Sequence, residues 1–327
     1  MDIKTRFLGL DLNSPVIVGS SDLSASLANI EKMEESGAGA VVLKSILEEE
    51  ILYSAGMKSS SMGFYGVSGS NYDFVREHIP AQGTRKYLEH IRSIKERFAI
   101  PVIASVNCCA FGGWVNFVQG LKDAGCDAVE LNIFNLPCDM NMSYDDVDRL
   151  YADTLLALGR IRNLPVVVKM ENYFTDLAKF VQRLSMYGIS AVTLFNGIPG
   201  FDIDTDGKKI INRQAPMQSG DPSLPLMWTA LLSKRISCDI SVSGGITTSD
   251  DVIKAMLAGA ATVQTVSALY RHGIEYIGEL NSEIRRWMEK NQYESLEDFR
   301  GMLAIKTNSE ARQFTRIQFI KTIANIH

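Results

Sequence analysis

The chain has 327 residues, of which 46% are hydrophobic, and its formal net charge is −5. This length exceeds one doubly wound domain and suits a barrel of roughly 250 residues with insertions. The charge balance and the lack of a basic run exclude a nucleic-acid footprint. Because the N-terminal segment resembles neither a signal nor a transit peptide, and no long apolar run occurs, we expect a soluble cytoplasmic protein that has no contact with membranes.

Eight short apolar runs predict buried strands, and helical patterns lie between them. The runs cover residues 16–19, 40–44, 102–107, 128–133, 166–170, 191–196, 240–244 and 262–268. The helical patterns cover residues 27–36, 87–98, 114–124, 147–162, 176–187, 227–235 and 248–258. Strands that alternate with helices are typical of an α/β fold with a parallel sheet.

The residues before each run separate odd strands from even ones. The even runs each follow a glycine that is typical of a helix C-cap, namely Gly37, Gly125, Gly188 and Gly259. The first, third and fifth runs follow a proline, and Asp239 takes this place before the seventh. Eight strands of two alternating kinds predict a closed (β/α)8 TIM barrel, in which odd and even strands fill different layers.

Long connections follow the even strands. Residues 46–84, 134–146 and 197–225 come after strands two, four and six, and such loops at the C-terminal face carry the chemistry of a barrel. Within the last of them, the Asp-Gly pair in residues 201–208 predicts a small hairpin, which we favour over a calcium loop because the closing glutamate is missing. C-terminal helices predicted over residues 274–290, 295–303 and 310–324 are expected to pack on the barrel, so that residues 1–327 form one domain.

Small and polar residues end the strands at the C-terminal face. They are Gly19, Ser20, Lys44, Ser45, Asn107, Asn132, Lys169, Asn196, Ser243, Gly244, Gly245, Val266 and Ser267. Small residues at the ends of strands seven and eight let backbone N–H groups approach an anion, so we expect a phosphate there. A lysine that closes an apolar run, as Lys169 does, needs either an anionic ligand or a salt bridge to a carboxylate such as Glu130 or Glu171.

A flat heterocycle with a phosphate tail suits this layout. Flavin mononucleotide (FMN) is the first such cofactor, and a phosphorylated sugar or pyrimidine stays open. Five cysteines without a CxxC pair predict neither a disulfide framework nor a metal site.

Six short motifs, in order, resemble the class 1 dihydroorotate dehydrogenases and are most similar to the dihydroorotate dehydrogenase-like branch of that family. They lie within residues 14–20, 38–45, 130–132, 165–169, 243–246 and 258–269. The resemblance implies an FMN-binding (β/α)8 enzyme of pyrimidine biosynthesis. It places most of the strand-end residues around FMN, with Asn132 and Asn196 also touching the substrate.

The chain departs from the family where the substrate chemistry lies. Class 1 enzymes carry Asn-Leu-Ser-Cys-Pro-Asn after strand four, and the cysteine removes a proton from the substrate; here Asn135 stands at that position. An amide cannot accept this proton, so Cys138, Ser45, Tyr144 and no side-chain base at all are the alternatives. The Pro-Asn of a second family motif is also missing, whether residues 62–66 or 78–81 are aligned with it.

The sequence therefore predicts an FMN-dependent oxidoreductase that transfers hydride between a small cyclic substrate and flavin, with dihydroorotate or a related dihydropyrimidine as the first candidate. Lys44 and Lys169 are the expected catalytic lysines, and Lys169 supplies the cation beside a reduced flavin. The alternatives are a non-redox isomerase or lyase that uses one of these lysines on a phosphorylated small molecule, and a flavin-binding protein without catalysis. The electron acceptor and a homodimer stay open.

Overall fold

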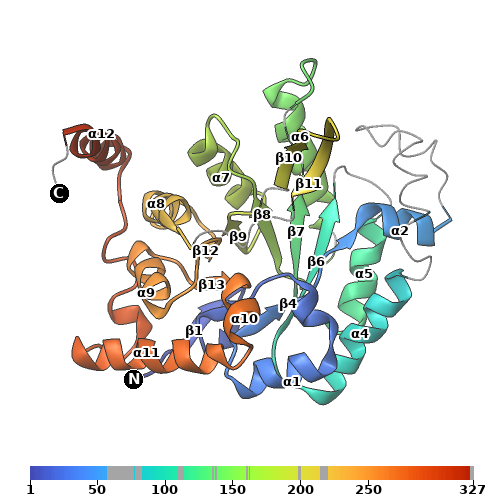
Figure 1. The fold of residues 1–327 in the computed structure, drawn as a ribbon, viewed down its shortest axis with the longest axis horizontal. Coiled ribbons are helices and arrows are strands. Elements are labelled where there is room, and N and C mark those ends of the chain that lie inside the picture. Colours follow the sequence, from blue (N-terminus) through green and yellow to red (C-terminus); the bar gives the residue numbers. More distant parts are fainter. Residues whose placement is uncertain are drawn as a thin grey trace.

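The structure, a computed structural model, describes residues 1–56, 77, 83–108, 114–134, 136, 138–159, 161, 163–197, 200–213 and 220–324. Parallel strands form a closed barrel with helices around it (Figure 1). The ring closes because β4 pairs with both β3 and β6. The barrel strands are β3 (Val16–Val18), β4 (Ala40–Val42), β6 (Val102–Cys108), β7 (Ala128–Ile133), β8 (Val166–Met170), β9 (Ala191–Leu194), β12 (Asp239–Ser243) and β13 (Thr262–Thr265). The predicted (β/α)8 TIM barrel is confirmed.

The helices between the strands are also those that the sequence predicts, with ends that differ by a few residues. They are α1 (Leu27–Glu35), α4 (Gly83–Arg97), α5 (Val115–Asp123), α6 (Tyr144–Leu158), α7 (Leu177–Met186), α8 (Ser223–Leu232) and α9 (Ser249–Ala258). The helix caps have the expected chemistry. Thr248 and Asp251 form a capping box at the start of α9, and Gly259 ends it in the left-handed conformation, with φ at 106°.

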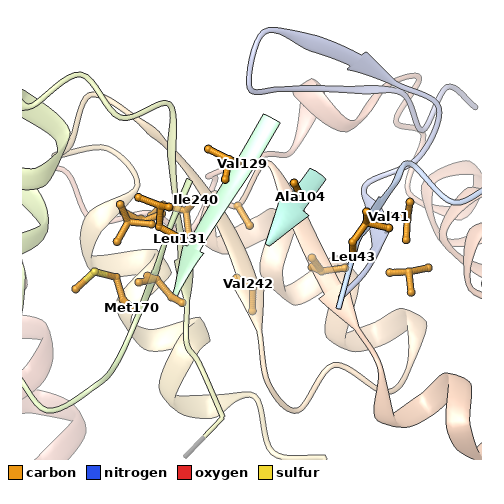
Figure 2. Close-up of a cluster of buried hydrophobic side chains, with 14 of the residues drawn as sticks. Val41, Leu43, Ala104, Val129, Leu131, Met170, Ile240 and Val242 are labelled. Atoms are coloured by element: carbon orange, nitrogen blue, oxygen red, sulfur yellow. The ribbon is translucent and has the colours of Figure 1, made fainter. Parts of the chain in front are cut away.

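Side chains of the strands alternate between the helix-facing side and the barrel interior. Figure 2 shows Val129 and Leu131 of β7, Met170 of β8 and Ile240 of β12 among the side chains of the buried apolar cluster. This cluster also contains residues of the surrounding helices, such as Ile91 of α4, so it is the layer between barrel and helices. The residues between these positions along each strand therefore point into the barrel.

A hairpin that the sequence analysis missed closes the N-terminal end of the barrel. It consists of β1 (Thr5–Phe7) and β2 (Leu10–Leu12), and both strands are only three residues long. Phe7 and Leu12 are buried against inward-facing residues of the barrel strands, among them Val42 and Val167. This apolar floor leaves the polar inward-facing residues to the C-terminal half of the barrel.

The C-terminal face carries the longer connections. The predicted hairpin is confirmed as β10 (Gly200–Asp204) paired with β11 (Lys209–Arg213), and it stands above the barrel in Figure 1. After β4 come β5 (Ile46–Leu47), which pairs with β6, and α2 (Glu48–Ser54). Short helical segments η1 (Asp22–Ala25) and α10 (Ser267–His272) follow β3 and β13.

The C-terminal helices fit the prediction only in part. Helix α11 (Tyr276–Lys290) packs on the barrel with buried apolar side chains. The helix expected over residues 295–303 is wrong: a single 3-10 turn, η3 (Leu296–Asp298), forms there, and Gly301 has a φ of 70° that ends helical geometry. Helix α12 (Asn308–Ala324) has no buried residue and projects from the barrel beside α8 (Figure 1). In the described part of the chain, no helix is long and apolar enough to cross a membrane.

Candidate active site

Four strands contribute polar side chains to one buried cluster inside the barrel. Lys169 of β8 donates from Nζ to Glu130 Oε1 of β7 at 3.4 Å and to Gln264 Oε1 of β13 at 3.2 Å. Glu130 Oε2 accepts from Thr193 Oγ1 of β9 at 2.9 Å and from Gln264 Nε2 at 2.6 Å. Strands β7 and β13 are not neighbours in the sheet, so the contact between Glu130 and Gln264 crosses the interior.

The contacts of Lys169 include the salt bridge that the sequence offers as one of two explanations for this lysine. Lys169 is only 8% exposed and Glu130 1% exposed, and the two form an ion pair. The salt-bridge interpretation is thus confirmed with Glu130 as the partner. A fixed ammonium group at this depth can still act on a ligand above it, because it is held by the barrel rather than by a flexible loop.

Three asparagines meet above this cluster. Asn107 Nδ2 donates to the backbone oxygen of Asn132 at 3.3 Å, and Asn196 Nδ2 donates to Asn132 Oδ1 at 2.9 Å. The strand register explains the grouping, because Asn107 lies opposite Asn132 and Asn132 lies opposite Lys169. The ends of the third, fourth and sixth barrel strands therefore present amides to one place, as the sequence predicts.

A carboxylate that the sequence analysis had considered only as a salt-bridge partner joins this group. Glu171 is 1% exposed, and its Oε1 accepts a hydrogen bond of 2.7 Å from Asn196 Nδ2. Its Oε2 is buried and has no hydrogen-bond partner in the described structure. Burial raises the pKa of Glu171, against the opposing effects of the Asn196 hydrogen bond and the Lys169 charge. The two-residue spacing from Lys169 in the sequence could have revealed that both side chains face the interior.

A row of hydroxyl groups joins the first three strands at the same face. Ser45 Oγ lies 2.7 Å from Ser105 Oγ and Ser20 Oγ lies 3.2 Å from Ser45 Oγ. Lys44, by contrast, points to the surface. Its side chain is 62% exposed, and Nζ lies 2.5 Å from Asp22 Oδ1. The structure therefore groups Ser20 and Ser45 with the site and places the ammonium group of Lys44 outside the buried cluster.

The glycines after β12 differ from each other in their surroundings. Gly244 has a φ of 97°, and a Cβ atom built on it would meet no atom within 4 Å. Gly245 has a φ of 78°, and a Cβ atom there would lie 2.5 Å from the backbone of Asp221 and Pro222. Gly244 therefore provides the open space that an anion needs, whereas Gly245 is required by the close approach of the chain that leads into α8.

The remaining predicted residues lie around this opening. Ser243 ends β12 and is half-buried. Val266 precedes Ser267, the first residue of α10, and its side chain occupies the place that a Cβ atom on Gly19 would need. The two strand ends thus pack closely, and Val266 and Gly19 contribute backbone rather than side chains.

Two of the candidate bases, Cys138 and Tyr144, lie in the loop after β7 and at the start of α6. Cys138 is exposed in the loop after β7, and both lysines expected to activate it are paired with carboxylates, Lys44 with Asp22 and Lys169 with Glu130. Tyr144 lines a cavity of about 160 Å³ between this loop and the loop after β8, together with Tyr173 and Phe174. Asn135 and residues 62–66 and 78–81 lie outside the described residues. Cys138 as a base stays a prediction.

The site has the features that a bound flavin phosphate requires. Open space at Gly244, hydroxyl groups on the first strands, a fixed buried ammonium group and converging amides fit FMN. Among the described residues, no group of acidic, histidine or cysteine side chains could hold a metal ion. Fold and site together define a cofactor-binding (β/α)8 enzyme with its active site at the C-terminal mouth.

The chain belongs to the dihydroorotate dehydrogenase family, whose model matches residues 2–288. It is 27% identical to the catalytic subunit of dihydroorotate dehydrogenase B (NAD(+)) from Methanosarcina acetivorans over 307 residues, which cover 90% of this chain and 94% of the relative. It is also 27% identical to the protein of that name from Thermoplasma acidophilum over 310 residues, 92% of this chain and 98% of the relative. The family uses FMN, and the chain is a dihydroorotate dehydrogenase-like oxidoreductase.

Proposed function

We propose that this protein transfers hydride between FMN and a small cyclic substrate, dihydroorotate or a related dihydropyrimidine, which binds at the C-terminal mouth of the barrel. The observation that carries the proposal is the buried Lys169 under a row of amides from neighbouring strands. When bound, FMN supplies the two-electron acceptor for the chemistry. Family membership gives the non-redox alternative no support.

In this proposal, different residues bind the phosphate, the remainder of FMN and the substrate. Gly244, Gly245 and Ser267 hold the phosphate by their backbone, with Ser243, Val266 and Gly19 shaping the space. Ser20, Lys44, Ser45, Asn107 and Lys169 contact the remainder of FMN, and Asn132 and Asn196 face both cofactor and substrate. Because Lys44 is exposed and paired with Asp22, its contact requires that its ammonium group leave this surface pair, which has a low cost.

The proposal extends to the electron acceptor and to the oligomeric state of the protein. The relatives are named for NAD(+) and as catalytic subunits. NAD(+), reached through a partner subunit, is therefore the first acceptor to test. We further propose a cytoplasmic homodimer in which all of residues 1–327 serve one barrel. Light scattering after size-exclusion chromatography tests the dimer.

The decisive experiment begins with the colour of the purified protein. We expect a flavin absorption band at about 450 nm and its anaerobic loss on addition of dihydroorotate. A panel of dihydropyrimidines then ranks substrates by the rate of this bleaching. A colourless protein that takes up no FMN would contradict the cofactor assignment, and a yellow protein that no dihydropyrimidine bleaches would contradict the substrate class.

A further inference from the structure

The two carboxylate oxygens of Glu171 differ in their hydrogen bonds. Oε1 accepts the 2.7 Å hydrogen bond from Asn196, which fixes the carboxyl group. Oε2 is buried, and the described residues offer it no hydrogen-bond donor. A buried polar atom without a partner is costly, so it indicates either a missing ligand or a functional role. Asn196 also contacts Asn132, so this oxygen lies beside the amides that we assign to cofactor and substrate.

The neighbouring carboxylate, Glu130, cannot serve in the same way. Both of its oxygens already accept hydrogen bonds, from Lys169, Thr193 and Gln264. A new O–H bond on either oxygen would have to displace one of these donors. Of these two carboxylates, only Glu171 has an oxygen ready for a new O–H bond.

We propose that Glu171 is the general base of this enzyme and accepts, on Oε2, the proton that leaves the substrate carbon next to the carbon that loses hydride. This proposal rests on the proposed function. The C–H bond of the first carbon breaks, its proton forms an O–H bond with Oε2, and its electron pair becomes the new carbon–carbon double bond. The neighbouring carbon gives up its hydride, with both electrons, to the bound FMN. In the reverse direction, Glu171 returns the proton.

The surroundings of Glu171 suit a group that must change its protonation state. Burial raises its pKa, which makes the carboxylate a stronger base, while Lys169 on the same strand and the Asn196 amide act in the opposite direction. The other titratable groups that sense its charge are Tyr151 of α6 and Tyr173 of the loop after β8. The pKa values of both tyrosines are raised, first by burial and then by the Glu171 charge.

The test compares wild type with Glu171→Gln, which keeps an oxygen for Asn196 but cannot accept the proton, and with Cys138→Ala, which removes the rival candidate base. Flavin reduction by dihydroorotate is followed anaerobically by stopped flow. We expect Glu171→Gln to slow reduction by at least about a hundredfold at unchanged flavin content, since loss of a general base costs 10²–10⁴-fold. Glu171→Asp should recover part of the rate, because it retains a carboxylate.

A second readout does not depend on activity. Because the folded protein holds Glu171 with a raised pKa, wild type loses stability relative to Glu171→Gln as the pH rises above the ordinary glutamate value of about 4.3. The melting temperature of wild type minus that of Glu171→Gln should therefore fall from about pH 4 upward, until Glu171 is ionised in the folded protein as well. A constant difference across this range would show that Glu171 does not titrate as a buried carboxyl and would overturn the proposal.

The outcomes separate the two proposals. If wild type is bleached and Glu171→Gln is reduced within tenfold of the wild-type rate, Glu171 is not the base, although the proposed function stands. If Cys138→Ala instead shows the hundredfold loss, the base is the loop thiol. If no dihydropyrimidine bleaches wild type, the proposed function is wrong, and the role of Glu171 is wrong with it.

Discussion

Replacing Lys169 by methionine should destabilise the protein. Methionine is also long and unbranched, so the main loss is electrostatic: Glu130, at 1% exposure, keeps two neutral donors and loses its cation. Removing one partner of a buried ion pair leaves an uncompensated buried charge, which costs about 3–5 kcal/mol. We therefore expect Lys169→Met to lower the free energy of unfolding by about that amount.

Urea unfolding measures this loss, and two FMN concentrations separate it from the contribution of ligand binding. The double variant Lys169→Met/Glu130→Gln has no uncompensated charge and should recover at least half of the loss. A deficit of Lys169→Met under about 1 kcal/mol, or a double variant as unstable as the single one, would refute this account of the pair.

The double variant also separates stability from chemistry. It lacks the fixed ammonium group but no longer carries a buried, unpaired carboxylate. If Lys169 stabilises negative charge on the reduced flavin, the double variant should be folded and yellow and yet be reduced slowly. Wild-type reduction rates in this variant would show that Lys169 serves only the interior ion pair.

Three further predictions test other parts of the site and fold. Gly244→Val should abolish flavin binding. Gly188 has a similarly positive φ and equally open surroundings, so the control variant Gly188→Val should strain the backbone to a similar degree but remain yellow. Equal flavin content in the two variants would show that the phosphate lies elsewhere. Cys138→Ala should change the flavin reduction rate by less than tenfold, because the thiol is exposed, and a hundredfold loss in stopped flow would contradict this. Removal of residues 308–327 should alter the free energy of unfolding by less than about 1 kcal/mol, because α12 buries no residue and its hydrogen bond from Arg235 to Asn308 is exposed. A larger loss in urea unfolding would reveal a further contact of this helix, such as one across a dimer.

The barrel was predictable because local signals repeat along the chain. Each even strand follows a glycine, and Gly37, Gly125, Gly188 and Gly259 all adopt the positive φ that a helix C-cap requires. The hairpin β1–β2 gave no such signal, because strands of three residues are too short to show a period. Its position against Val42 and Val167 depends on closure of the barrel, which joins residues far apart in the sequence.

The sequence predicts which strand-end residues form the site, but it does not predict which partner each of them contacts. Asn132 and Asn196 were expected to converge, and they share a hydrogen bond. Lys44 and Lys169 look alike in sequence, since each closes an apolar run, yet one is exposed and the other buried. The difference depends on which partner is near, Asp22 or Glu130, and partners from other strands or loops are not visible along a single run.

The barrel interior is apolar at its N-terminal floor and polar toward its C-terminal mouth. Substitutions at different depths are therefore expected to have different effects on stability and activity. At the floor, Phe7 and Leu12 fill the barrel with apolar contacts. Above them, Glu130 and Lys169 satisfy each other with the help of Thr193 and Gln264. At the mouth, Glu171 has one oxygen for which the described part of the chain offers no hydrogen-bond donor. A change in the middle layer therefore breaks bonds that the protein makes to itself, and it lowers stability. A change at the mouth removes a group that we propose contacts a ligand, so we expect it to lower activity while the fold survives.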